Sequence, residues 1–317
     1  MKFKQIPEDF IVKEIKGFES DNGLYNVFLL KKTDYTTEKA VQIISKALGI
    51  KRTNIGYAGI KDRRAVTEQY ISIFKVSKIR VENLKLKNLS LKFVSTSKNA
   101  LAVGELKGNE FNIIVRNLPK NTKIRANARI KNYFDEQRFS NKNSEIGLAI
   151  IKKNFKKAVE FVLENSGDYE KDVKTFLDEN QNDYIGALKK IPFRIRLLFI
   201  HAYQSSLFNR LIEKLDLNEN IKVPIVGFAT EYEDDFLKKK LKKLLVLDDV
   251  TERDFIIPSI PSLSIEGSSR LLYVIPKNLF VGDLEKDDLN KYKYKLRLRF
   301  SLVKGAYATI VVKNLLN

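Results

Sequence analysis

The chain has 317 residues, of which 44% are apolar, so it can form one large globular domain or two moderate ones. Its 58 Lys and Arg residues against 39 Asp and Glu residues give a net charge of +19, which favours nucleic acid as a partner. A surplus of solvated lysines on an ordinary protein gives the same charge. The chain has no cysteine and one histidine, His201, which excludes disulfides, thiolate catalysis and a histidine-rich metal site.

The first 130 residues or so predict an alternation of strands and helices. Residues 9–15 alternate in the manner of a strand, and residues 25–30 are apolar enough for a buried strand. A helical pattern begins at Thr37, and Gly49 is a natural end for it. Further strands are predicted at residues 71–76, 84–93 and 111–116.

The middle of the chain, about residues 122–250, is predicted to be mainly helical. Apolar residues fall at helical spacing over 148–162 and 197–211. Residues 231–245 have acids first and lysines last, an order that complements a helix dipole. The lysines of this run are more typical of a solvated helix face than of a dedicated RNA contact.

The end of the chain returns to strands, at 271–275 and 294–301, before Gly305 interrupts the pattern ahead of residues 307–316. Strands at both ends of a helical middle predict one α/β domain with a helical insertion. Pro7, Glu8 and Asp9 interrupt any secretory signal, and no apolar run is long enough to span a bilayer. We therefore expect a cytoplasmic protein.

The most informative segment is residues 54–70, NIGYAGIKDRRAVTEQY. Gly56 and Gly59 permit a tight loop, and the loop contains Asp62. Cations near a carboxylate favour its charged form and also attract phosphate, which suits an enzyme that acts on RNA. By spacing alone, however, the segment is more typical of a surface ion pair in a turn. The neighbouring cations, any of which could pair with Asp62, are Lys61, Arg63 and Arg64.

Other catalytic motifs are absent from the sequence. No Walker phosphate loop and no Gly-x-Ser-x-Gly elbow occurs. His201 could serve a hydrolase triad, but it lies in an apolar helical pattern that favours a structural role.

Residues 56–70 resemble the signature of the TruD family of tRNA pseudouridine synthases. Other segments resemble motifs of that family in the family's own order, so that the resemblance covers nearly the whole chain. Its most specific parts are the Asp62 loop and the Gly-Asn-x-Phe strand at 108–111. The other matching segments are residues 7–15, 132–140, 201–209, 223–232 and 300–316.

The resemblance implies a role for particular residues. Asp62 would be the catalytic carboxylate, and Phe111 would pack against the target uracil. Asn109 would hold the active-site loop and its hydrogen bonds, and Lys4 would sit near the substrate. Lys61 and Arg63 are further candidates for substrate binding. Without the resemblance, Phe111 would be assigned to ordinary core packing.

The resemblance also implies a fold, a reaction and a partner. The α/β (α+β) fold would comprise a pseudouridine-synthase-like catalytic domain with an antiparallel or mixed sheet, residues 1–133 and 272–317. A mainly helical domain, residues 134–271, would be inserted in it. The reaction would convert a uridine of tRNA, typically at position 13, to pseudouridine, with no metal or other cofactor. Oligomeric state is not predicted.

The chain departs from the family pattern at Asp135 and Ser140, where glycine is common, which puts the local geometry at the insertion boundary in doubt. Two alternatives to the enzyme are a non-catalytic protein that binds structured RNA on the same scaffold and a hydrolase built around His201. Retention of Asp62, Asn109 and Phe111 together argues against the first, and the missing elbow argues against the second.

Overall fold

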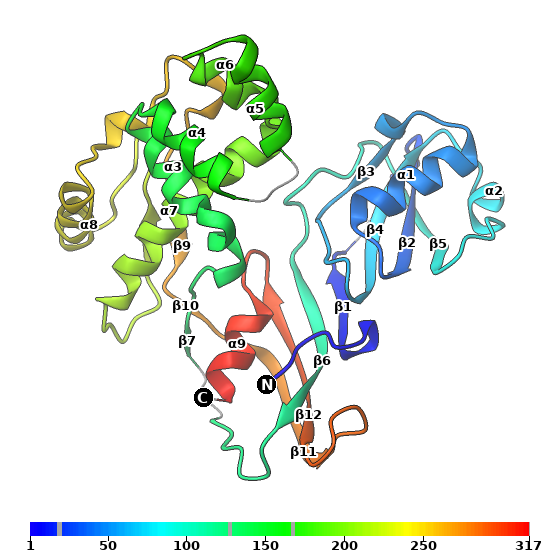
Figure 1. Ribbon diagram of the computed structural model, residues 1–317. Helices are drawn as coiled ribbons and strands as arrows, with labels where there is room; N and C mark the ends of the chain where they lie inside the picture. The colour runs from blue at the N-terminus through cyan, green and yellow to red at the C-terminus, as the bar shows by residue number, and fades with distance from the viewer. Residues whose placement is uncertain (18–20, 126–128, 166–168, 317) are drawn as a thin grey trace. The chain divides into compact units, whose positions relative to one another are not determined.

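The computed structural model describes residues 1–17, 21–125, 129–165 and 169–316. The chain divides by its internal contacts into two compact units, Met1–Arg129 with Ile275–Asn317 and Ile130–Val274. The first unit is α/β with a mixed sheet and the second is mainly helical, which confirms the predicted fold class (Figure 1). Among the described residues, no helix is long and apolar enough to cross a membrane.

A mixed sheet of eight strands, all in the described part of the chain, forms the first unit (Figure 1). The strands follow the order β11-β12-β6-β1-β4-β2-β5, and β3 pairs with β4. Only the β1–β4 pair is parallel among these described pairings. The strands are β1 (Phe10–Ile15), β2 (Tyr25–Thr33), β3 (Ile55–Tyr57), β4 (Val66–Phe74), β5 (Leu89–Ser97), β6 (Gly108–Leu118), β11 (Lys277–Lys286) and β12 (Tyr294–Val303).

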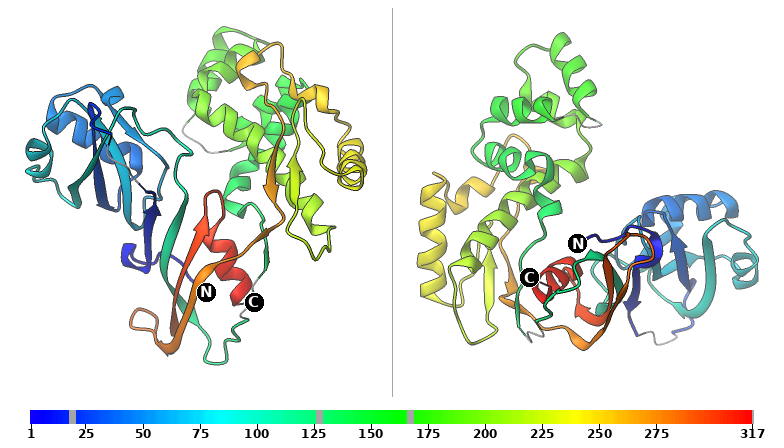
Figure 2. Two further views of the ribbon diagram at one scale, coloured as in Figure 1. Left: turned by 180° about the vertical axis from the view of Figure 1, so that it is seen from behind. Right: turned by 60° about the horizontal axis from the view of Figure 1, so that its bottom comes forward.

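Helix α1 (Thr37–Leu48) packs through its apolar stripe against the core residues of β2, β3 and β4, as the stripe predicts. Its first turn is capped by the Thr36 side chain, which accepts a hydrogen bond from the Lys39 amide. Gly49 ends the helix in the left-handed region at φ 63°, as predicted. The unit also contains α2 (Lys78–Glu82), α9 (Ala308–Leu315) and the short 3-10 helices Pro7–Asp9 and Arg52–Asn54. Helix α9 lies beside β6 and β12 in each view (Figure 2).

One row of residues crosses five neighbouring strands on a single face of the sheet. Lys32 of β2 is the register partner of Thr67 on β4, and Thr67 is the partner of Val12 on β1. Val12 is opposite Phe111 of β6, which is opposite Phe300 of β12. Register partners in a sheet point to the same face, so this row places Lys32 and Phe111 on one surface.

The second unit consists mainly of helices. Their bounds differ in one place from the helices that the sequence predicts. The helical pattern over 148–162 is two helices, because the chain turns at Lys153, whose φ is 57°. The helices are α3 (Asn143–Ile151), α4 (Phe155–Glu164), α5 (Glu170–Glu179), α6 (Tyr184–Lys190), α7 (Phe193–Glu213) and α8 (Asp235–Leu247), with 3-10 helices at Glu136–Lys142, Glu252–Phe255 and Pro261–Leu263. Two short ladders pair β7 (Ile130–Lys131) with β10 (Tyr273–Val274) and β8 (Lys222–Ile225) with β9 (Ser268–Leu271).

Candidate active site

Asp62 lies in the loop between β3 and β4, residues 58–65. The loop starts at buried Ala58 and ends at buried Ala65, so its two ends are fixed in the core. Between them the Asp62 side chain is 49% exposed. The structure thus presents this carboxylate to solvent from a loop with buried ends.

Lys4 is the direct partner of Asp62. Its Nζ donates a hydrogen bond of 2.7 Å to Asp62 Oδ2 and lies 4.2 Å from the centroid of the Phe10 ring. The sequence predicted both residues for the site, and the structure brings them together. The direct partner of Asp62 is thus Lys4 and not one of the loop cations Lys61, Arg63 and Arg64, any of which the sequence allowed.

The chain around Lys4 is held in place from several sides. Lys4 has φ 54°, a left-handed conformation that a lysine seldom adopts. The Lys2 amide donates to the Arg116 carbonyl at 2.8 Å, and Arg64 Nη2 donates to the Gln5 carbonyl at 3.1 Å. Asp9 Oδ2 accepts from the Ile6 amide at 3.1 Å. These bonds fix the backbone on both sides of Lys4 and so fix where its ammonium group lies.

The two arginines of the loop point to other partners. The guanidinium of Arg63 is largely exposed and lies 3.6 Å from Asp34 Oδ1. Arg64 binds the Gln5 carbonyl. Arg63 is therefore accessible to a polyanion, whereas Arg64 serves to attach the N-terminal segment to the loop.

Lys61 points into the protein, where its Nζ lies 2.5 Å from Glu14 Oε2. The side chains are only 5% and 0% exposed, respectively. Within the described part of the chain, Glu14 Oε1 has no hydrogen-bond partner. Our prediction that Lys61 binds substrate is untested, but in this structure its ammonium group belongs to a buried ion pair.

Phe111 and Asn109 lie on β6 beside β1. Phe111 is 6% exposed, and its ring packs against Phe10 and Phe300, with ring centroids 6.1 and 5.5 Å away. Asn109 is opposite Glu14 in the ladder, and its Oδ1 is buried with no hydrogen-bond partner among residues 1–17, 21–125, 129–165 and 169–316. An unpaired buried amide oxygen is costly, so it marks a place where a ligand donor would be favourable.

Gly108 precedes this pair and permits the close approach of β6 and β12. A Cβ at this position would lie 2.3 Å from the Leu302 carbonyl oxygen, which is backbone. We expect Gly108→Ala to lower the free energy of unfolding by about 1–3 kcal/mol, because the strands must separate. Urea unfolding measures this, with Gly17→Ala as the control, since among the described residues a Cβ there meets only the Lys107 Nζ, at 3.7 Å. Equal losses in both variants would contradict the explanation.

Three buried polar residues below the loop were not predicted for the site: Lys32, Thr37 and Gln69, each 0% exposed. A signal for Lys32 does exist in the sequence. It lies in phase with Phe28 and Leu30, two residues apart along β2, so alternation directs it to the buried face.

His201 lies in α7, and its Nδ1 is 3.0 Å from Gln204 Oε1. Burial lowers the pKa of His201, and the Gln204 hydrogen bond partly offsets this. The neighbour is an amide rather than the acid that a hydrolase triad requires. In the described part of the chain, no group of three or more His, Asp or Glu residues is arranged to hold a metal ion. The expectation of metal-independent activity stays a prediction.

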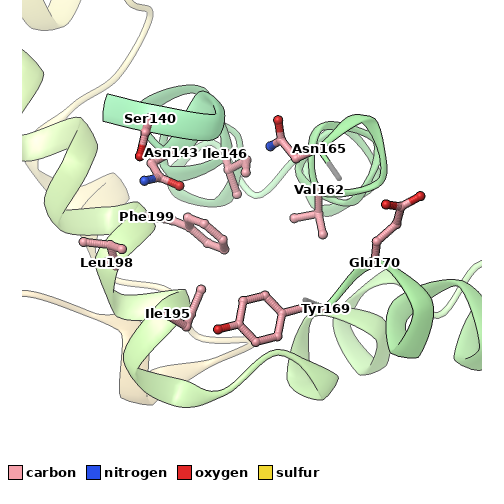
Figure 3. Close-up of a pocket in the computed structure, with 10 residues that line it drawn as sticks. All are labelled: Ser140, Asn143, Ile146, Val162, Asn165, Tyr169, Glu170, Ile195, Leu198 and Phe199. Atoms are coloured by element: carbon pink, nitrogen blue, oxygen red, sulfur yellow. The ribbon is translucent and has the colours of Figure 1, made fainter. Parts of the chain in front are cut away.

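The second unit contains a cavity of about 200 Å³ (Figure 3). Ile146, Val162 and Phe199, from α3, α4 and α7, point into it, and Tyr169 lies across from Val162 (Figure 3). None of the residues predicted for the site lines this cavity.

The sequence is similar to known proteins over nearly its whole length. The family model described as tRNA pseudouridine synthase D (TruD) matches residues 1–173, 162–221 and 216–315. The chain belongs to the TruD family. A protein of Methanocaldococcus jannaschii named "Probable tRNA pseudouridine synthase D 2" is 32% identical over 99% of this chain and 91% of its own. The tRNA pseudouridine synthase D of Aquifex aeolicus is 29% identical over 99% and 98%, respectively.

A solved TruD structure, from Methanosarcina mazei, supports the same assignment. It superimposes with a TM-score of 0.75 at 26% identity and covers 99% of this chain and 93% of that one.

The two departures from the TruD motif lie near the start of the second unit. Asp135 has φ −72° and caps the following 3-10 helix through the Glu136 amide, and Ser140 lies within that helix. The backbone at Asp135 thus needs no glycine.

Proposed function

We propose that this TruD protein isomerises a uridine of tRNA to pseudouridine, with Asp62 as the catalytic carboxylate. The observation that carries the proposal is the half-exposed carboxylate of Asp62, held 2.7 Å from the Lys4 ammonium group on a loop with buried ends. The reaction is that of the TruD family, and the loop holds the Asp62 carboxylate in a position that is both accessible and fixed.

The reaction balances within one nucleotide. The bond from uracil N1 to ribose C1′ breaks, and a bond from C5 to C1′ forms. The proton on C5 is lost and N1 gains one, so no electrons are transferred and no group leaves. A carboxylate can attack the sugar, add to the ring or remove the C2′ proton, and each of these routes requires its charged form.

The other predicted residues fit supporting roles. The target base must leave its stack, which costs a few kcal/mol, and an aromatic surface around Phe111 offsets part of that cost. The unpaired Oδ1 of Asn109 would accept a hydrogen bond from the uracil or from an ordered water. Exposed Arg63 would contact phosphate, whereas buried Lys61 would shape the loop.

The substrate class is tRNA, and within it we propose the uridine at position 13, the position typical of the family. The net charge of +19 would attract the tRNA backbone. We further propose that the helical unit corresponds to the inserted domain predicted at 134–271, that it contributes to RNA binding, and that the protein acts in the cytoplasm.

The test is incubation of the purified protein with unmodified tRNA transcripts, followed by site-resolved mapping of pseudouridine. The expected product is pseudouridine at one position, 13. Conversion at another position would refute the assigned site while supporting the reaction. Tight tRNA binding with no conversion in any transcript would favour the non-catalytic RNA-binding alternative.

Lys4→Met is expected to slow the reaction with little effect on stability. The Lys4–Asp62 pair is partly exposed, so it contributes little to folding. In the occupied, water-excluded site a hydrogen bond to a charged group is worth roughly 1.5–3 kcal/mol. That corresponds to about 10- to 150-fold in rate. Single-turnover kinetics and the melting temperature measure the two effects, and an unchanged rate would show that Lys4 has no part in the reaction.

A further inference from the structure

A lysine with no exposed surface lies directly beneath the Asp62 loop. Lys32 is 0% exposed, yet its Nζ carries a charge that is costly to bury. It donates to the main-chain carbonyl of Asp62 at 2.8 Å and to that of Tyr35 at 2.6 Å. One ammonium group therefore ties the residue that bears the reactive carboxylate to the turn between β2 and α1.

Two further buried side chains hold the same loop by its backbone. Thr37 Oγ1 accepts from the Lys61 amide at 2.9 Å and donates to Gln69 Oε1 at 2.8 Å. Gln69 Nε2 donates to the Gly59 carbonyl at 3.0 Å. Lys32, Thr37 and Gln69 thus fix the loop at residues 59, 61 and 62 from three different elements.

The pKa of Lys32 reflects both its burial and the nearby charge of Asp62. Burial lowers the pKa of Lys32 to about 8, which nearby Asp62 partly offsets and Lys61 reinforces. Near neutral pH the group is still mainly charged, so it can donate to both carbonyls. Lys32 does not reach substrate, because it is enclosed, and it can act only through the loop.

We propose that Lys32 is a positioning residue for pseudouridine formation, which sets the place of the Asp62 carboxylate by binding the Asp62 main-chain carbonyl. Thr37 supports it through the adjacent Lys61 amide. The inference rests on the proposed function, since it needs Asp62 to be the reacting carboxylate. A misplaced catalytic group slows the chemical step without weakening tRNA binding.

The test compares Lys32→Met with Lys31→Met, a matched control on the same strand. Both changes remove one positive charge, but the Lys31 side chain is 55% exposed and lies 3.9 Å from Glu68. The measurement is the rate of pseudouridine formation in a single turnover at saturating enzyme, together with the dissociation constant for tRNA. Partial misfolding raises the enzyme concentration needed for saturation but leaves the saturated rate unchanged.

The expected result is a saturated rate about 10- to 100-fold lower in Lys32→Met, with tRNA affinity within about twofold of wild type. Lys31→Met keeps the wild-type saturated rate. A wild-type saturated rate in Lys32→Met overturns the inference, whatever its melting temperature. If wild type itself forms no pseudouridine, the proposed function fails and this inference with it. If wild type is active, the Lys32→Met rate decides wherever that variant folds.

A second variant decides the matter if Lys32→Met does not fold. Thr37→Val removes the acceptor of the Lys61 amide with almost no change of shape. Its control is Thr67→Val, because the Thr67 hydroxyl is buried and has no hydrogen-bond partner among the residues that the structure describes. A lower saturated rate in Thr37→Val but not in Thr67→Val supports the proposal that buried side chains position the Asp62 loop. Wild-type saturated rates in both variants overturn that proposal.

Discussion

Replacing Asp62 by asparagine is expected to abolish pseudouridine formation while tRNA still binds. The amide keeps the size of the side chain and an oxygen that can accept from Lys4, but it is neither a nucleophile nor a base. Loss of a group that acts directly in the chemical step costs at least about 1,000-fold in rate. The measurement is pseudouridine per tRNA over a long single-turnover incubation, with affinity measured by filter binding.

Asp34→Asn is the matched control for this variant. Asp34 is a carboxylate of similar exposure, 52%, close to Arg63 of the same loop. Its replacement removes the same charge near the site and should leave the rate within about twofold, as expected for an exposed ion pair. Near-normal turnover in Asp62→Asn would remove Asp62 from the chemistry, and equal losses in the two variants would point to a general effect of charge.

The second large effect concerns stability. Lys61→Met would leave the Glu14 carboxylate buried with neither oxygen paired to a described residue. Lys61 holds Oε2, and Oε1 has no partner in the described part of the chain. Breaking a buried pair from one side costs about 3–5 kcal/mol. Hydrogen exchange of peptides 10–15 and 66–74 during urea unfolding reports this loss within the first unit.

Two further variants separate the buried pair from a simple change of charge. Glu14→Gln combined with Lys61→Met removes both charges and should recover at least half of the lost free energy of unfolding, because replacing a whole buried pair is often neutral. Lys31→Met, at an exposed lysine, should change it by less than about 1 kcal/mol. A Lys61→Met protein as stable as wild type would show that Glu14 is accommodated without its partner.

Much of the fold could be predicted from the sequence because the apolar pattern is regular. The period of the stripe over residues 37–48 gave α1, and alternation over residues 294–301 gave β12. Strand β11 was not predicted, because its residues are mostly exposed and it carries two register irregularities against β12. Residues 84–88 were predicted as strand, but β5 begins only at Leu89.

The site was predictable only in part, and for a physical reason. Motif resemblance predicted roles for Asp62 and Lys4, which are 58 positions apart in sequence and hydrogen-bonded in the structure. Sequence spacing predicted that the cations beside Asp62 could pair with it, but a side chain in a loop can point toward solvent or toward the core. Lys61 points inward to Glu14, and this depends on the packing of β1 against the loop rather than on local sequence.

Release of tritium from tRNA labelled at C5 of its uridines tests the central claim most directly. Formation of the C5–C1′ bond displaces the hydrogen on C5, so each isomerised uridine releases one label to water. Wild-type protein should release label equivalent to about one uridine per tRNA when position 13 alone is modified. Folded wild-type protein that binds the tRNA but releases no label would contradict the account.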